Sequence, residues 1–414
     1  MESLRVRCCI AGGGPAGMML GYLLARAGIE VAVLEKHGDF LRDFRGDTVH
    51  PSTLEVMAEL GLLDGFLQRP HQEFTQIAGR INGVEVPIAD FSHLPGRCTF
   101  VVLMPQWDFL DFLAAAGKRY SGFRVLMDAE VRDLIVEGER VAGVRASTPE
   151  GELEIRADLV VGADGRHSTV RARAGLDVRD FGAPIDVLWM RLSKRAEDPV
   201  STLGYFEAGR LIVTIDRGEY WQCALVIPKG GLDALRARGL EALRADITAI
   251  VPFLGERIGE LHDWGQIKLL TVVVDRLQRW HRPGLLCIGD AAHAMSPMGG
   301  VGINLAIQDA VAAANLLAAP LLAGSLTERD LQAVQRRRLF PVRVTQAVQV
   351  FAAQRIFANL TTGAPPVRRG PGPLPWPVRL LSRFPVLRRL PARFIGLGVR
   401  PEHVRTPEAS LRAG

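Results

Sequence analysis

Apolar residues in the first part of the sequence alternate between short continuous runs and a helical stretch. A run at residues 6–11 enters the turn Gly12-Gly13-Gly14, and residues 15–27 then carry a cluster of apolar side chains before Gly28. A second apolar run, residues 31–34, ends in Glu35. The pattern predicts a strand, a helix and a second strand, the repeating unit of a parallel α/β sheet.

Further along the chain the pattern is typical of short strands separated by turns. Residues 74–94 and 187–227 alternate apolar and polar side chains, and Asn82-Gly83 predicts a hairpin turn in the first of these segments. Together they predict a second sheet, mostly antiparallel. Other strands are predicted at residues 99–104, 123–127, 130–137, 140–147, 152–155, 157–161, 266–274 and 284–290, and helices at residues 51–60, 105–116, 232–250, 302–318 and 328–358.

The composition fits a globular protein large enough for two or three domains. Of the 414 residues, 48% are hydrophobic and 23% are charged. The most apolar stretch, residues 301–324, contains Asn304, Gln308 and Asp309, and so predicts a buried helix and not a membrane span. The first apolar run begins at residue 6, so we expect no signal peptide.

The cysteines and the charge distribution narrow the functional classes. The five cysteines lack metal-site spacing, so we predict no metal, reduced thiols and a cytoplasmic location. After residue 363 there are ten arginines and two glutamates. These arginines alternate with Pro, Leu, Phe and Trp, which argues against nucleic-acid binding. Two interpretations remain: a tail packed over the domain interface, which we favour, or a basic apolar element that touches a membrane or a lipophilic substrate.

The first turn has the spacing of a dinucleotide-binding fingerprint. Gly12 permits the tight turn, Gly14 lets the backbone approach a pyrophosphate, and Gly17 lets the helix pack on the strand. The helix N-terminus then faces the phosphates, and Glu35 is placed to accept hydrogen bonds from ribose hydroxyls. The cofactor-binding residues predicted here are Gly12, Gly14, Pro15, Ala16, Gly17, Glu35 and Lys36.

Two later motifs place an acid after an apolar strand. Asp164 follows the strand at residues 157–161 and precedes a basic helix start. Asp290 ends the strand at residues 284–290, and a glycine-rich turn then opens the long apolar helix. Backbone N–H groups at such a helix start can hold an anion or a flavin ring carbonyl. Asp-Gly is also a common turn pair, so the Asp164 motif alone is ambiguous.

Together and in this order, the three motifs resemble those of the single-component FAD-dependent aromatic hydroxylases typified by p-hydroxybenzoate hydroxylase. The resemblance covers roughly residues 6–358 and is thin across residues 177–266. We predict an α/β fold with a Rossmann-like FAD-binding domain and an inserted substrate domain formed by a second, mostly antiparallel sheet. The FAD-binding domain would comprise residues 1–73, 97–180 and 267–362, and the substrate domain residues 74–96 and 181–266. Residues 363–414 would form a basic, proline-rich and irregular C-terminal segment.

The resemblance assigns further roles by position. Asp164 would serve both FAD and the nicotinamide cofactor, and Asp290 would bind the ribityl chain. Arg45 matches an arginine near the pyrophosphate, and Gln106 matches another FAD contact. The residues that match the loop and helix start beside the isoalloxazine are Pro297, Gly300, Gly302, Ile303 and Asn304. A single dinucleotide fingerprint fits this family, and it leaves the choice between NADH and NADPH open.

The function that the resemblance implies is hydroxylation of a phenol-like or polyketide/quinolone-like aromatic substrate. FAD, NAD(P)H and O2 would act through a flavin C4a-hydroperoxide, which must be kept from water. Pro297 and Asn304 would lie at the reaction site. Tyr205 lies near the position of a substrate-activating tyrosine, with a core aromatic as the alternative. Trp189, Arg191, Tyr205 and Trp221 are candidates for the substrate pocket, although simple packing explains each of these residues as well.

Two alternative functions remain. The first is a related flavoprotein that reduces or dehydrogenates a lipophilic or isoprenoid substrate without inserting oxygen, and the basic C-terminal segment fits it. The second is a flavin-binding protein without catalytic activity, against which the intact Asp164 and Asp290 motifs argue. We expect a monomer or a homodimer with no nucleic-acid partner and no transmembrane segment, and peripheral membrane contact remains open.

Overall fold

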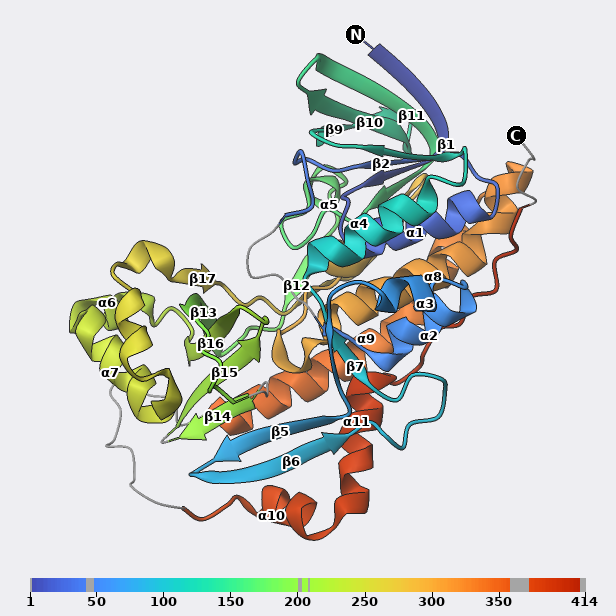
Figure 1. Cartoon of the computed structure of the whole chain (residues 1–414). Helices are drawn as coiled ribbons and strands as arrows, with labels where there is room; N and C mark the ends of the chain where they lie inside the picture. The colour runs from blue at the N-terminus through green and yellow to red at the C-terminus, as the bar shows by residue number, and fades with distance from the viewer. Residues whose placement is uncertain (1, 42–47, 200–202, 208, 358–371, 410–414) are drawn as a thin grey trace.

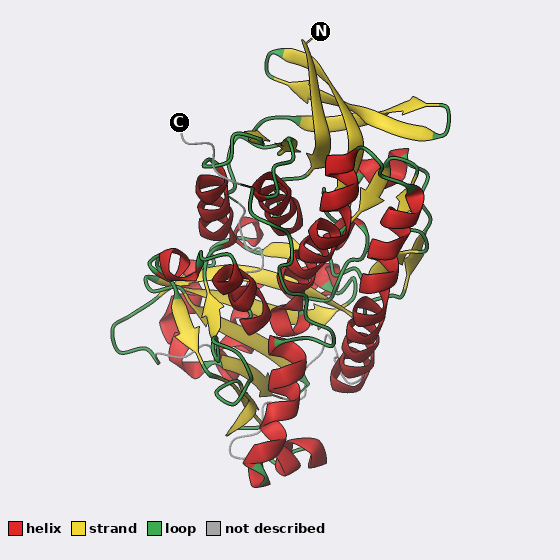
Figure 2. Cartoon of the chain, turned by 90° about the vertical axis from the view of Figure 1, so that its right-hand side faces the viewer, coloured by secondary structure: helices red, strands yellow, loops and turns green. Residues whose placement is uncertain are grey.

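The structure is a computed structural model that describes residues 2–41, 48–199, 203–207, 209–357 and 372–409. Two large sheets and a set of long helices make up the fold (Figure 1). Figure 2 shows helices clustered in the middle of the molecule, with strands above and below them. The predicted mixed α/β class is confirmed.

The first sheet carries the predicted β-α-β unit. Its order is β19-β20-β11-β1-β2-β8, and β10 and β9 extend it from β11. The strands β20, β11, β1, β2 and β8 run parallel, so their carboxyl ends lie at one edge. β11 replaces two predicted strands: its first half pairs antiparallel with β10, and its last residues pair parallel with β20. The strands are β1 (Glu2–Ala11), β2 (Val31–Leu34), β8 (Phe123–Leu126), β9 (Glu130–Glu137), β10 (Arg140–Thr148), β11 (Gly151–Gly162), β19 (His281–Arg282) and β20 (Leu285–Cys287).

Helix α8 forms the centre of the helical layer and packs against α1 and α9. The segment Met298–Ala323, which contains α8, is long and apolar enough to cross a membrane, yet 72% of its most apolar window is buried within the fold. This burial agrees with the prediction of a buried helix. The α-helices are α1 (Pro15–Arg26), α2 (Pro51–Glu59), α3 (Leu63–Leu67), α4 (Gln106–Gly117), α5 (Thr169–Arg173), α6 (Leu232–Arg238), α7 (Leu240–Ile250), α8 (Val301–Ala323), α9 (Glu328–Phe357), α10 (Trp376–Arg383) and α11 (Arg389–Gly396).

The second sheet has the order β17-β13-β16-β15-β14-β5-β6, and every pair is antiparallel except β14 with β5. The β5–β6 hairpin turns at Asn82 and Gly83, which both have positive φ as the predicted turn requires. β17 belongs to this sheet, although the sequence division ended the substrate domain at residue 266. The strands are β5 (Gln76–Ile81), β6 (Val84–Asp90), β13 (Ile185–Ser193), β14 (Leu203–Glu207), β15 (Arg210–Asp216), β16 (Tyr220–Pro228) and β17 (Lys268–Leu270), and two smaller sheets hold β3 (Thr48–Val49), β4 (Gln72–Phe74) and β7 (Val101–Leu103), and β12 (Val178–Asp180) and β18 (Asp275–Leu277).

The prediction of an irregular C-terminal segment is wrong for residues 376–396. They form α10, the 3-10 turn η5 (Pro385–Arg388) and α11, which lie against β6 (Figure 1). The prolines Pro377, Pro385 and Pro391 stand in the first turns of these helices, where the missing N–H removes no hydrogen bond. Proline content alone therefore does not exclude helix here.

Candidate functional site

The carboxyl ends of four parallel strands bring the three sequence motifs together. Ala11 pairs with Leu34 on one side and with Gly162 on the other, and Gly162 pairs with Cys287. The loops that follow these residues therefore lie side by side. Ligands of open α/β sheets bind at this edge, which makes it the candidate cofactor site.

Close backbone contacts build the first loop. Gly12 has a φ of 108°, and a Cβ on it would overlap the carbonyl oxygen of Ala163 in the second loop. A Cβ on Gly17 would overlap the carbonyl oxygen of Gly12, so α1 starts close against the strand. At Gly14, in contrast, nothing lies within 4 Å of the position that a Cβ would take. The loop is packed against the second motif and open in front of α1.

The N-terminus of α1 is suited to an anion. Gly14 is its N-cap, and Pro15 and Ala16 are its first residues. The first turn contains no acidic side chain, so the free N–H groups and the helix dipole favour a negative group there. A phosphate in front of Gly14 would meet both open space and favourable charge.

Glu35 ties the end of β2 to this loop. It is 8% exposed, and its Oε2 accepts a hydrogen bond from the N–H of Gly13 at 3.1 Å, while Oε1 accepts one from the N–H of His37 at 3.1 Å. A carboxylate has further lone pairs with which to accept from a ribose hydroxyl. Lys36 is exposed, and Arg45 lies outside the described residues.

Asp164 shapes the second loop. Its Oδ1 accepts a hydrogen bond from the Ser168 hydroxyl at 2.5 Å, and its Oδ2 accepts one from the N–H of Val170 at 3.1 Å. Burial raises the pKa of this carboxyl, and the hydrogen bonds oppose the rise. Ser168 is in turn the N-cap of α5. These contacts favour a turn-forming role, and the predicted contact of Asp164 with a cofactor stays a prediction.

The side chain of Asp290 is more open to solvent than that of Asp164. Asp290 lies in the short 3-10 turn η3 (Gly289–Ala291), where a Cβ on Gly289 would approach Ala16 at 3.1 Å, so the third loop contacts the start of α1. The Asp290 side chain is 35% exposed and lies 3.9 Å from Arg166. Its carboxylate therefore remains accessible to a polyol such as a ribityl chain.

The glycine-rich segment provides a second open helix N-terminus. It enters α8 through the 3-10 turn η4 (Met298–Gly300), with Pro297 exposed before the turn and Ile303 half-buried after it. Gly300 is the N-cap of α8, with a φ of 62°. Nothing lies within 4 Å of a Cβ position on Gly302, and the first turn of α8 contains no acid.

Asn304 holds this segment in place, and its predicted position at the reaction site stays a prediction. Its Oδ1 accepts hydrogen bonds from the N–H of His50 and the hydroxyl of Thr53, both at 2.8 Å. Its Nδ2 donates to the carbonyls of Thr48 and Gly300, both at 3.1 Å. Because all four hydrogen-bonding positions of this buried amide are used within the chain, Asn304 is a positioning residue.

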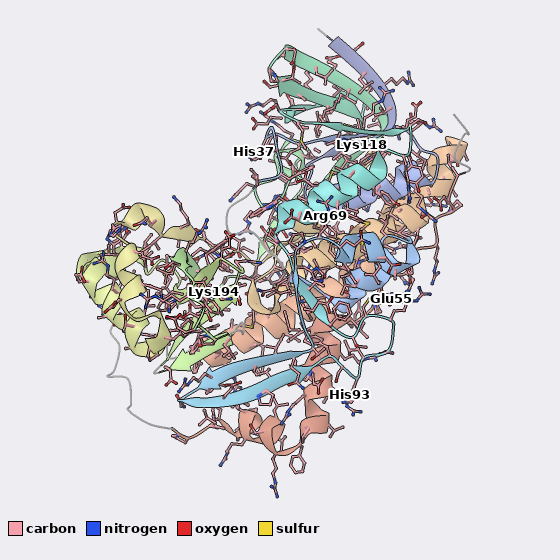
Figure 3. The ribbon with its side chains drawn as sticks, in the orientation of Figure 1. His37, Glu55, Arg69, His93, Lys118 and Lys194 are labelled. Atoms are coloured by element: carbon pink, nitrogen blue, oxygen red, sulfur yellow. The ribbon has the colours of Figure 1, made fainter. Side chains whose placement is uncertain are left out.

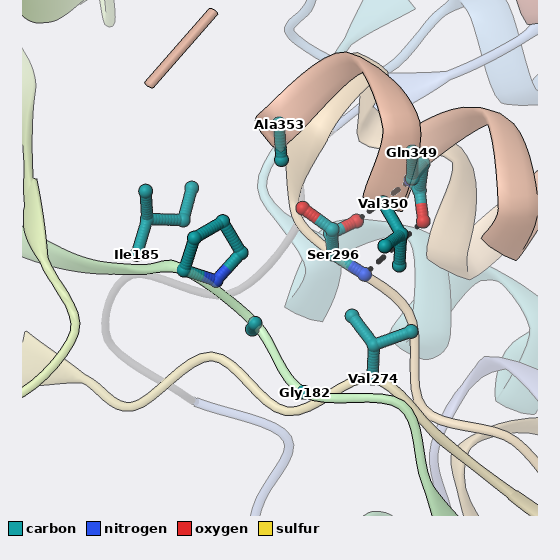
Figure 4. Close-up of a pocket in the computed structure, with 9 residues that line it drawn as sticks. Gly182, Ile185, Val274, Ser296, Gln349, Val350 and Ala353 are labelled. Atoms are coloured by element: carbon teal, nitrogen blue, oxygen red, sulfur yellow. Dashed lines mark hydrogen bonds between the residues drawn. The ribbon is translucent and has the colours of Figure 1, made fainter. Parts of the chain in front are cut away.

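Gln349 of α9 holds the same segment from the other side, next to a small pocket (Figure 4). Its Nε2 donates to the carbonyls of Ser296 and Met298 at 3.0 and 2.9 Å, and its Oε1 accepts from the N–H of Ser296 at 3.2 Å. No local sequence pattern marks Gln349 or His50 as a positioning residue, because His50 is 254 positions from Asn304 and Gln349 is 53 from Ser296. Residues that line the pocket include Gly182, Ile185, Val274, Val350 and Ala353.

Taken together, the edge fits FAD. A dinucleotide has a charged pyrophosphate at its centre and electron-rich ring carbonyls at its flavin end. The chain offers two helix N-termini without acids, with open space at Gly14 and at Gly302. Gln106, the first residue of α4, is half-buried, and its side-chain amide makes no hydrogen bond within the described residues, which leaves it available to a ligand.

One face of the second sheet lies towards this edge. Its buried apolar residues pack with Ala353 and Phe357 of α9 and with Met298 of the glycine-rich segment. Trp189 is half-buried on this face. Arg191, two residues further along the strand, is exposed, and its guanidinium lies 3.8 Å from the ring centre of Tyr220. The other half-buried apolar side chains of this face include Leu211, Val213 and Leu270.

Tyr205 and Trp221 lie on the opposite face of the sheet, away from Met298, and their predicted place in the substrate pocket stays a prediction. Both belong to the core beneath α7 and the 3-10 segment η1 (Pro252–Glu260), and both rings contact Phe253. The Trp221 indole donates to Asp198 at 2.8 Å. Burial raises the pKa of the Tyr205 phenol, which keeps it protonated and unsuited to act as a base.

Comparisons with known proteins agree with this geometry. A family model described as "FAD binding domain" matches residues 5–348. The chain is 34% identical to the 6-methylpretetramide 4-monooxygenase of Streptomyces rimosus, over 96% of this chain and 94% of that protein. It is 28% identical to a rifampicin monooxygenase of Streptomyces venezuelae, over 73% of this chain and 61% of that longer protein.

A solved structure has a similar fold. PqsL of P. aeruginosa, crystallised in complex with 2-aminobenzoylacetate, superposes with a TM-score of 0.73 at 24% identity, covering 86% of this chain and 99% of PqsL.

Proposed function

Because the chain belongs to the family of FAD-dependent aromatic-compound monooxygenases, we propose that it hydroxylates a polycyclic aromatic substrate, with NADH or NADPH as electron donor and O2 as oxidant. Bound FAD would supply the electron transfer and oxygen activation for which side chains have no equivalent. The residues of the chain would bind and orient FAD and the substrate, and would shield the reacting ring from water.

Binding is assigned to the three loops at the edge of the first sheet. The N-terminus of α1 would hold the pyrophosphate, Glu35 the adenosine ribose, and Asp290 the ribityl chain. The N-terminus of α8, opened by Gly302, would stabilise negative charge that develops on the ring system. Asn304 and Gln349 keep that helix start in its shape without contacting the reacting atoms.

The observation that carries the proposal is the half-buried apolar face of the second sheet beside this helix start. Trp189, Val213 and Met298 would cover a flat apolar ring and exclude water from it. A relative that matches nearly the whole chain is a 6-methylpretetramide monooxygenase, and another relative is an anhydrotetracycline 6-monooxygenase. Both names support a polycyclic, polyketide-like substrate for this chain.

A cytoplasmic location is part of the proposal. All five cysteines are free and buried, which suits a reducing compartment. Reducing equivalents from NADH or NADPH are available in the same compartment.

The test uses the FAD-loaded chain and a panel of polycyclic phenols. We expect a panel member to stimulate NADPH or NADH consumption and to gain one oxygen atom from isotopically labelled O2. Turnover that continues without O2, or product that lacks the label, would assign the chain to the alternative class of reductases or dehydrogenases. A purified chain that binds no FAD would overturn both assignments.

A further inference from the structure

The two C-terminal helices carry large apolar side chains on their outer sides. Trp376 is 70% exposed and Leu380 is 42% exposed, and the two lie four residues apart on one face of α10. Phe384, at which the helix ends, is 50% exposed. Val386 and Leu390 continue the exposed apolar set into η5 and α11, at 59% and 67% exposure. These five residues are here called the outer stripe. None of the residues of α10 is buried.

Arginines lie among the outer-stripe residues. Arg379 and Arg383 lie on the same side of α10 as Trp376, and Arg389 and Arg393 flank Leu390 on α11. No ion pair joins any of these four arginines to an acid within the described residues, and residues 372–401 include no Asp or Glu. The surface is therefore both apolar and uniformly positive.

We propose that the outer stripe docks on an anionic phospholipid surface. Tryptophan and leucine mixed with arginine on a helix face, with phenylalanine at the helix end, are typical of helices that lie in the membrane interface. The apolar side chains would enter the boundary between headgroups and acyl chains, and the arginines would meet the phosphates. An acidic protein partner would match the charge, but it requires a complementary groove for these projecting side chains.

The position of the stripe supports this assignment. α10 lies at one extremity of the molecule, with its side chains directed outward, and the end that carries His37 and Lys118 lies opposite (Figure 3). Because α10 lies at one end of the molecule, the outer stripe can reach a flat bilayer while the rest of the chain stays away from it.

The inner side of the same element reaches the candidate site. Gly396 of α11 packs so closely on Phe91 and Leu94 that an added Cβ would lie about 3 Å from both. A Cβ on Gly299, in the turn before α8, would lie 3.9 Å from Ile395. The docked surface would thus lie one helix away from the segment where we propose the ring is oxidised. An apolar polycyclic substrate concentrated in a bilayer would have a short route to it, a consequence that rests on the proposed function, whereas the docking itself does not.

The experiment is sedimentation of the full FAD-loaded chain with vesicles of phosphatidylcholine alone or mixed with phosphatidylglycerol. We expect binding at least about tenfold tighter to the anionic vesicles, falling as salt is added. The double variant L380E/L390E should lose about tenfold or more of this affinity, because it places carboxylates in the interface. Trp376 should report insertion by a blue shift of its emission, and W376F should keep binding but lose that shift.

The matched control is V136E, which places a carboxylate at a 46% exposed valine on β9, in the other half of the chain. It should bind vesicles as the wild type does, and all variants should keep the wild-type melting temperature. Equal binding by L380E/L390E and V136E would overturn the proposal, as would an absence of vesicle binding. Capture of an acidic protein without vesicle binding would assign the stripe to a protein partner. Because vesicle binding is measured without turnover, a failure of the hydroxylation assay leaves this result interpretable by itself.

Discussion

A substitution at Gly14 can test cofactor binding with little effect on folding. Gly14 has an ordinary extended backbone conformation, and nothing in the chain lies near the position of an added methyl group. We expect G14A to change the free energy of unfolding of the FAD-free chain by no more than about 0.5 kcal/mol. The methyl group would occupy the space proposed for the pyrophosphate, so FAD affinity should fall at least about tenfold. Flavin fluorescence titration and thermal unfolding measure the two effects.

The matched control for this prediction is Gly259, which also has open space around its Cβ position but lies in η1. G259A should leave FAD affinity unchanged. Unaltered FAD binding by G14A would place the pyrophosphate elsewhere.

His50 gives a prediction for pH. Burial lowers its pKa to about 4, and backbone groups of Ile395 and Gly299 oppose the shift. The unfolded chain takes up a proton on this ring below about pH 6.5, whereas the folded chain does so only near pH 4, so stability falls as the pH decreases between these values. Between pH 7.5 and pH 5 the wild type should lose about 2 kcal/mol more stability than H50Q.

Urea unfolding of both proteins across this range measures the difference, because the carboxylates of the chain contribute similarly to each. H93Q, which removes an exposed imidazole, should retain the wild-type pH dependence. Parallel curves for H50Q and the wild type would contradict the buried, neutral state of His50.

At the level of single residues, sequence reasoning was most informative where one side chain type is required locally. The spacing of Gly12, Gly14 and Gly17 located the first loop, and the acids after strands marked the other two. The sequence did not reveal that Asn304 and Gln349 would use their amides within the chain, because their partners come from distant segments.

Alternation along the strands divides the second sheet into a core face and a face towards the candidate site. Val213 lies on the face that packs with Met298 and α9, whereas its neighbour Ile212 and the paired Tyr205 lie on the face that packs with α7. We expect V213F to raise the KM for the aromatic substrate about tenfold by filling the pocket, with FAD affinity unchanged. Y205F should leave KM and kcat unchanged and lower stability by about 1 kcal/mol, through the loss of its hydrogen bond to Thr214.

Steady-state kinetics of the two variants with one substrate provides the test. A Y205F enzyme with a large loss of kcat would restore Tyr205 as the substrate-activating group. A V213F enzyme with normal KM would move the pocket off this face.

This division also shows the limit of prediction at the level of elements. Apolar alternation predicted the strands at residues 187–227, but the side on which each residue lies depends on what packs against the sheet. Trp189 and Trp221 lie on the paired strands β13 and β16 and still point to opposite faces, because Trp189 pairs with Ala224, an odd number of residues from Trp221. The face that a helix covers, here the face covered by α7, becomes the core face, and the alternate residues that point to it become the buried set.

Over the whole molecule, the C-terminal region contacts both parts of the fold. α10 and α11 pack on the β5–β6 hairpin of the second sheet. Residues 402–409, which form no helix or strand, then return to the helices of the first part, where Glu408 pairs with Arg26 and accepts a hydrogen bond from Tyr120. The region thereby links two parts of the chain that the sequence pattern had treated as separate.

Glu402 is the buried residue that holds residues 402–409 against the helices. It is 5% exposed, its oxygens accept from Arg337 at 2.8 and 3.0 Å, and Arg338 lies 3.4 Å away. Arg338 is itself 1% exposed and also donates to Asp309. We expect E402A to lower the free energy of unfolding by about 3 kcal/mol, because it leaves the buried Arg338 guanidinium partly uncompensated. E408A, which removes a more exposed carboxylate of the same segment, should lower it by less than about 1 kcal/mol. Urea unfolding of the two variants measures the contrast, and equal effects would show that the burial of Glu402 does not anchor the segment.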